Sequence, residues 1–161
     1  MNSFLKKSHF IFLFLTLNAV QVLHSQPGKN GSYTVSSTNQ ILNKYCPVTT
    51  NISSGSNTLV VANSTMLALC PGDLIMVYQA QGASINTLNT LAYGDITSYN
   101  SAGLYEFKYV QSYNNNTIVC QNSFTNSYVS TGNVQVVKVP QYVNLTLNIN
   151  SSIIAKPGRI P

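Results

Sequence analysis

The chain has 161 residues and a formal net charge of +5, and only 7% of its residues are charged. Because it contains only three acidic residues, the basic balance reflects a shortage of carboxylates. Nucleic-acid surfaces carry clustered Lys and Arg, whereas the basic residues after position 25 are spread singly. These are Lys29, Lys44, Lys108, Lys138, Lys156 and Arg159. We therefore expect no nucleic-acid partner.

Residues 1–25 have the layout of a secretory signal peptide. Lys6 and Lys7 precede an almost unbroken apolar run at 10–17, and Ser25 offers a small residue at the cleavage point. The run is shorter than the roughly 20 residues that cross a bilayer, so no transmembrane segment is expected after signal removal. The mature chain would begin with a polar segment at 26–40, contain no histidine and carry a charge of about +3. We expect a secreted or cell-surface protein.

The mature sequence predicts β structure almost throughout, because apolar residues recur with a period of two and Val, Ile, Thr and Tyr dominate. Strands are expected at 58–61, 73–79, 105–113, 117–120 and 134–139. The stretch DLIMVYQ at 73–79 is apolar on both faces and should be central in a sheet. Short strands separated by Gly, Asn and Pro turns favour an all-β fold, a small β-barrel or β-sandwich, over residues 41–142.

A long Gly- and Asn-rich segment at 82–104 has no clean period, and connections of this length often carry binding function. A loop packed by its own Leu, Ile and Tyr side chains is the simpler interpretation. Together with the glutamines before it and the tyrosines after it, the loop forms a candidate ligand surface. Its residues are Gln79, Gln81, Tyr93, Asn100, Tyr105 and Tyr109.

The hairpin formed by 105–113 and 117–120 has two unlike faces. Strand pleating places an aromatic set on one face and a polar set on the other. The aromatic set is Tyr105, Phe107, Tyr109 and Tyr113, and the polar set is Glu106, Lys108 and Ser112. The tyrosines either pack the core with their hydroxyls at its edge or form an aromatic surface for a glycan or a protein.

Residues 143–150 alternate strictly between apolar side chains and Asn or Thr, which predicts a strand that needs an apolar surface to cover. We expect 143–161 to be the start of a second β domain.

Three cysteines would reach an oxidising compartment, where disulfides persist. Cys46 and Cys70 are the candidate pair, although their spacing does not establish a disulfide geometry. Cys120 ends an apolar strand and is expected to behave as a small buried hydrophobe. The mature chain has no histidine and no CxxC pair, so a zinc site is not expected.

Catalysis would depend on three carboxylates, Asp73, Asp95 and Glu106. Asp73 follows Pro-Gly at a strand entrance, where it can accept local backbone N–H bonds, and Glu106 lies beside Lys108 on one strand face. We therefore expect no enzyme and no cofactor. Asp95 and Glu106 are candidate calcium ligands, because Ca²⁺ takes oxygen donors, but their spacing matches no known ligand loop.

Three motifs occur in order: PGDLIMVYQAQGASI at 71–85, NTLAYGDITSYNSAGLYEF at 89–107, and VQVVKVPQY at 134–142. Together they resemble the N-terminal module of large secreted, adhesin-like surface proteins of Bacteroidota, which are often exported by type IX secretion. The chain departs from that pattern because Ala80 replaces a larger apolar residue and the tryptophan-containing, Gly-rich continuation is absent. It therefore resembles a truncated copy.

The resemblance implies a non-catalytic module of an exported adhesin-like protein, with a structural or ligand-binding role. Its partners would be an extracellular glycan or protein and the export machinery. The alternative is a glycan-binding module attached to, or part of, a secreted polysaccharide-acting enzyme.

Overall fold

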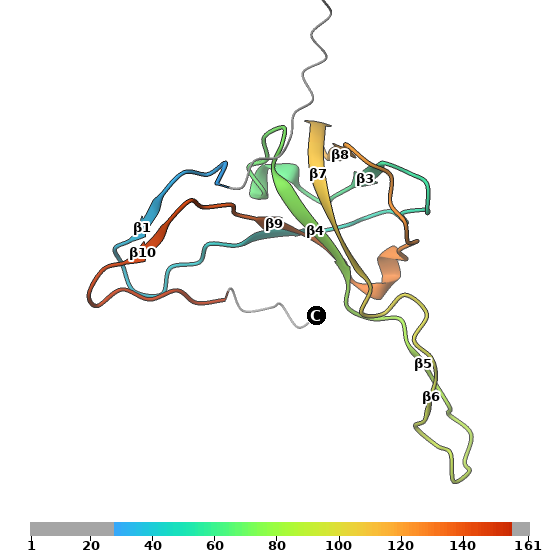
Figure 1. The fold of residues 1–161 in the computed structure, drawn as a ribbon. Helices are drawn as coiled ribbons and strands as arrows, with labels where there is room; N and C mark the ends of the chain where they lie inside the picture. Colours follow the sequence, from blue (N-terminus) through green and yellow to red (C-terminus); the bar gives the residue numbers. More distant parts are fainter. Residues whose placement is uncertain (1–27, 156–161) are drawn as a thin grey trace, which may run out of the picture.

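The computed structural model describes residues 28–155, so the expected signal peptide lies outside the described residues. The described chain is all-β, as predicted, and its only helical elements are two short 3-10 turns, η1 (Ser64–Met66) and η2 (Ser130–Gly132). Ten strands complete the fold, and Figure 1 labels them in place. They are β1 (Tyr33–Val35), β2 (Lys44–Pro47), β3 (Thr58–Val60), β4 (Leu74–Gln79), β5 (Ser84–Ile85), β6 (Ile96–Ser98), β7 (Tyr105–Asn114), β8 (Thr117–Cys120), β9 (Val134–Val139) and β10 (Leu145–Leu147). No helix in the described range has the length and apolar character to span a membrane.

Six strands form an antiparallel sheet in the order β2-β9-β4-β7-β8-β3. The central position predicted for the DLIMVYQ stretch is confirmed, because β4 lies between β9 and β7. The sheet curls until its ends meet, since Val48 bridges Val61 and Thr49 donates to the carbonyl of Val60. The curl encloses the apolar core, which includes Ile75, Val77, Val110, Ile118, Phe124, Tyr128, Val134 and Val136.

The long segment predicted as a loop at 82–104 extends from the sheet as a two-stranded arm, here taken as residues 80–104 (Figure 1). β5 and β6 pair antiparallel, with a register shift between Ser84 and Ile85. The apolar side chains of the arm are largely exposed, and Leu91 at its far end is fully exposed. The interpretation of a loop packed by its own side chains is therefore wrong.

At the opposite end of the molecule, β1 and β10 form a small separate lobe (Figure 1). They pair in parallel, Tyr33 with Leu145 and Val35 with Leu147, and a second parallel bridge joins Gln40 to Ile153. Between these two contacts both segments bend, and each bend contains an asparagine with positive φ. These are Asn39 at 58° and Asn150 at 62°. The lobe thus consists of two bent turns of chain stacked in parallel.

Candidate functional site

The aromatic face of β7 is exposed, and the face with Glu106 and Lys108 is turned inward. Tyr105 and Phe107 are 59% and 52% exposed, whereas Glu106 and Lys108 are turned toward the interior of the curl, where Ile75 and Val77 are their cross-strand partners. The interpretation that these tyrosines pack the core is therefore wrong. The aromatic side chains are on the convex surface of the sheet.

This convex surface, here called the outer aromatic face, spans three adjacent strands. In β7 and β4 the facing pairs are Tyr105 with Tyr78, Phe107 with Met76, and Tyr109 with Leu74, and β9 adds Gln135, Val137 and Val139. The rings of Tyr105 and Phe107 meet edge to face, with centroids 5.9 Å apart. None of these nine side chains is charged, because the pleat directs Glu106, Lys108 and Lys138 to the other side.

Glu106 fastens the segment after β8 to the inner side of β7. Its carboxylate accepts the backbone N–H groups of Thr125 at 3.0 Å and Asn126 at 2.7 Å, and the hydroxyl of Tyr128 at 3.2 Å. Lys108 forms an ion pair with it at 2.8 Å. Burial alone would raise the pKa of Glu106, but the bonds from Lys108 and the two backbone groups lower it from 4.5 to about 2. The side chain therefore has a structural role.

Asp73 is a second internal anchor, and it is only 3% exposed. One carboxylate oxygen accepts the N–H of Cys70 at 2.7 Å and pairs with Lys138 at 2.8 Å, and the other pairs with Lys29 at 2.7 Å. The predicted bond to a local backbone N–H is confirmed. Burial would raise the pKa of Asp73, but the hydrogen bonds from Lys138, Lys29 and Cys70 outweigh it and lower the pKa.

Gln79 is buried, whereas the sequence prediction placed it on an exposed ligand surface, although it also lines a cavity. Its amide nitrogen donates to the carbonyl of Gln81 at 2.7 Å, and its amide oxygen accepts the N–H of Val129 at 2.8 Å. Both ends of the side chain are therefore used to join the base of the arm to η2. Gln81 contributes its carbonyl to this junction, and its residue is otherwise exposed.

A cavity of about 370 Å³ lies at this junction. It is lined by Gln79, Gly82, Asn100, Ser101, Val129, Thr131 and Gly132, none of which is charged. Asn100 adopts a positive φ of 48°, and its amide nitrogen donates to the carbonyl of Gly82 at 2.7 Å. Asn100 therefore lines the cavity and also closes the base of the arm.

We expect Gly132→Ala to destabilise the fold at the same junction. An added Cβ would lie 2.4 Å from the amide nitrogen of Gln79 and 2.5 Å from the carbonyl oxygen of Gln81, and the second of these is backbone. Overpacking of this kind costs about 1–3 kcal/mol. Urea unfolding followed by circular dichroism measures the decrease in the free energy of unfolding. Gly132 does not have a positive φ, so the clash is the cost expected there. In contrast, Gly55→Ala, at a φ of 86° with no atom within 4 Å of the added Cβ, measures the cost of backbone strain without a clash. An unchanged midpoint for Gly132→Ala would contradict the steric reading of the junction.

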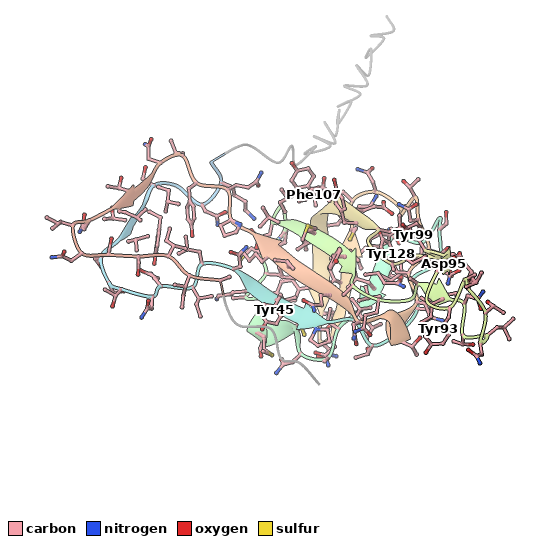
Figure 2. The ribbon with its side chains drawn as sticks, turned by 90° about the horizontal axis from the view of Figure 1, so that it is seen from below. Tyr45, Tyr93, Asp95, Tyr99, Phe107 and Tyr128 are labelled. Atoms are coloured by element: carbon pink, nitrogen blue, oxygen red, sulfur yellow. The ribbon has the colours of Figure 1, made fainter. Side chains whose placement is uncertain are left out.

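The remaining predicted site residues are dispersed over the molecule. Tyr93 and Asp95 are exposed on the arm, and Figure 2 shows them with Tyr99 at the end opposite the β1–β10 lobe. Tyr109 is half-buried on the outer aromatic face, on the same strand as Tyr105 with Phe107 between them. Of the two candidate calcium ligands, Glu106 is already bonded to internal donors. Within residues 28–155 no group of three His, Cys, Asp or Glu side chains could hold a metal ion.

The candidate pair Cys46 and Cys70 is not joined, because both residues are free thiols. Cys46 is buried, and its sulfur accepts the backbone N–H of Asn63 at 3.2 Å, whereas Cys70 is exposed beside the turn that contains Asp73. Cys120 is buried, as predicted, and burial raises the pKa of its thiol to about 11.

No protein-family model and no curated protein matches the chain. Among solved structures it is similar to three phage tailspikes. The Gp54 tailspike of Acinetobacter baumannii phage AP22, solved with A. baumannii capsular saccharide, is 17% identical with a TM-score of 0.41, over 76% of this chain and 17% of that chain. The tailspike gp61 of Pseudomonas phage phi297 is 15% identical with a TM-score of 0.44, over 79% of this chain and 20% of that chain. The tailspike gp49 of Pseudomonas phage LKA1 is 16% identical with a TM-score of 0.44, over 78% of this chain and 22% of that chain. The chain spans about a fifth of each tailspike, and the similarity is too low to assign a family.

Proposed function

We propose that the chain is a non-catalytic module of an exported, adhesin-like protein, and that its outer aromatic face binds an extracellular polysaccharide of uncharged sugars. The observation that carries the proposal is the exposure of Tyr105 and Phe107 on a sheet face without charged side chains. Exposed apolar groups that are gathered on one face mark interaction sites in soluble proteins. The resemblance to adhesin-like surface proteins supports the same role.

The chemistry of this face suits a neutral glycan. A sugar ring presents apolar C–H groups on its flat sides, which can lie against aromatic rings, and its hydroxyls can bond to phenolic oxygens and amides. Tyr105 and Tyr78 provide both kinds of group side by side, and Gln135 adds an amide from β9. A charged ligand would find no opposite charge among these residues.

The state of the acidic residues supports a binding role over hydrolysis. A general acid must hold a proton at the working pH, but the carboxyl pKa values of Asp73 and Glu106 are both lowered. Both groups are also occupied by internal donors. Asp95 is on the exposed arm, away from either.

Replacing Tyr105 and Phe107 together by Ala is expected to weaken polysaccharide binding about tenfold or more, since stacking residues dominate such sites. A panel of purified neutral and acidic polysaccharides would identify a binder, and titration calorimetry would give the affinities of the parent and the variant. Tyr93→Ala is the matched control, because it removes an exposed tyrosine from the arm and should leave the affinity unchanged.

Equal affinity of the Tyr105/Phe107 variant and the parent would contradict the proposal. Preference for acidic over neutral polysaccharides would contradict the ligand class. If the bound polysaccharide became shorter during the incubation, the chain would instead belong to a polysaccharide-acting enzyme, which is the alternative function.

A further inference from the structure

The cavity at the base of the arm has walls that are fixed by hydrogen bonds within the chain. It lies where the arm leaves the sheet beside η2 (Figure 1). Gln81 donates its backbone N–H to the carbonyl of Gly132 at 2.8 Å, and Ser101 donates its hydroxyl to the carbonyl of Ser127 at 3.1 Å. These bonds tie the arm to η2 and to the segment before it. The cavity is therefore preformed, as small-molecule sites usually are.

The amide of Gln79, which lines this cavity, has one proton left over. Its oxygen accepts the N–H of Val129, and its nitrogen donates one proton to the carbonyl of Gln81. An amide nitrogen carries two protons, and the second has no acceptor within residues 28–155. Because the residue is only 1% exposed, bulk water reaches this proton poorly. An oxygen of a ligand in the cavity would satisfy it.

Other lining residues add both donors and acceptors. The hydroxyl of Thr131 and the backbone N–H of Gly82 have no hydrogen-bond partner in the described part of the chain. The oxygen of the Ser101 hydroxyl can still accept a bond, because only its proton is used. Val129 contributes an apolar group that is 44% exposed. The cavity thus offers several open polar groups next to one apolar contact.

This lining favours a small neutral ligand with many hydroxyls. A charged ligand would lose hydration without meeting an opposite charge, since the lining contains no charged side chain. The hydroxyls of a sugar both donate and accept, and its ring C–H groups can lie against Val129. A volume of about 370 Å³ is near the lower end for small-molecule sites, so it suits one sugar residue.

We propose that this cavity is a second glycan site, which binds a single neutral sugar residue. The choice of a sugar rests on the proposed function, but the site is separate from the outer aromatic face. Gln79 is buried on the inner side of β4, whereas Tyr78 before it faces outward beside Tyr105. The sequence predicted Gln79 and Asn100 as parts of one ligand surface, and both line this cavity.

Titration of the isotope-labelled chain with single sugars, followed by two-dimensional NMR, tests the site. The sugars are glucose, galactose, mannose and N-acetylglucosamine. We expect at least one of them to shift the side-chain amide signal of Gln79 and the backbone amide signals of Gly82 and Gly132. The dissociation constant should be about 1–10 mM, as for an uncharged ligand of ~12 non-hydrogen atoms. Glucuronic acid should bind more weakly than glucose, because its carboxylate has no counter-ion in the cavity.

Thr131→Val is the diagnostic variant, because it removes an unpartnered hydroxyl and nearly keeps the side-chain shape. The dissociation constant of the sugar should rise about fivefold, which is the effect of one lost hydrogen bond. Thr87→Val is the matched control, since it removes a hydroxyl from an exposed position on the arm and should leave the constant unchanged. The signals that shift in the parent locate the site even if Thr131→Val fails to fold.

The outcomes separate this inference from the proposed function. The variant with Tyr105 and Phe107 replaced by Ala should bind the single sugar as the parent does, and Thr131→Val should leave polysaccharide binding unchanged. Sugars that shift only the signals of Tyr105 and Phe107 would overturn the cavity site and leave the proposed function standing. Sugar binding at the cavity without polysaccharide binding at the outer aromatic face would do the reverse. Equal affinity of parent and Thr131→Val, or no saturable shift below about 100 mM sugar, would overturn the inference.

Discussion

Replacing Asp73 by Ala should lower the free energy of unfolding by about 3 kcal/mol. The substitution leaves Lys29 and Lys138 close together without their shared counter-ion, and it leaves the N–H of Cys70 without its acceptor. The two ammonium groups are only partly exposed, at 29% and 16%, so water can compensate for only part of the loss. Urea unfolding of the purified chain, followed by circular dichroism, measures the change.

Asp95→Ala provides the matched control, since it removes the same side chain from an exposed position on the arm and should change stability by less than about 0.5 kcal/mol. Asp73→Asn should lie between the two, because an amide oxygen can still accept the N–H of Cys70 while both ion pairs are lost. If Asp73→Ala and Asp95→Ala unfold at the same urea concentration, the three-residue anchor is not stabilising the fold.

Acid should destabilise the fold through Glu106 at pH values below about 4.5. The pKa of Glu106 is about 2 in the folded chain and 4.5 without its partners, so between these values the unfolded chain binds the proton more readily. Its stabilisation is complete above pH 4.5 and is lost as the pH falls through 2. The shift corresponds to about 3 kcal/mol. Asp73, whose pKa is also lowered, adds to the loss in the same direction.

Glu106→Gln separates the two contributions. At neutral pH the free energy of unfolding of the variant should be lower than that of the parent by an amount approaching the about 3 kcal/mol assigned to Glu106. Between pH 4.5 and 2 the free energy of unfolding of the variant should change less than that of the parent. Unfolding free energies measured across this range would show the difference in slope. Identical slopes for parent and variant would mean that the bonds of Glu106 to the 125–128 segment do not depend on its charge.

Local pattern was enough to predict five of the six strands of the sheet, but it did not predict the edge strand β2. The alternation in 105–113 and 117–120 predicted the β7–β8 hairpin, and DLIMVYQ was placed at the centre of the sheet. The sequence of β7 alone could not predict which of its faces is buried, because the aromatic face with Tyr105 and the polar face with Glu106 alternate equally regularly. The segment that follows β8 decides it, because its Phe124 and Tyr128 are buried in the core. The Tyr128 hydroxyl and the backbone N–H groups of Thr125 and Asn126 donate to Glu106.

The parts of the site that depend on distant partners could not be predicted. Gln79 was expected to contact ligand because it ends a strand beside a polar loop, but the N–H of Val129, 50 residues away, takes its amide oxygen. Lys29 was only one of several scattered cations until the fold brought it to Asp73. A better signal was the isolation of Asp73 in an apolar run, since a buried carboxylate requires a cation.

The parallel lobe also constrains the order in which the chain can fold. Tyr33 pairs with Leu145, 112 positions later, and closing so long a loop in an unfolded chain carries a large entropic cost for a ladder of three residue pairs. Pairing of β2 with β9 sets Lys44 beside Lys138, and so the segments leading to β1 and β10 leave the sheet from neighbouring positions. Once the sheet exists, the two segments are tethered together. The lobe is therefore expected to form last and, by the same reasoning, to open first.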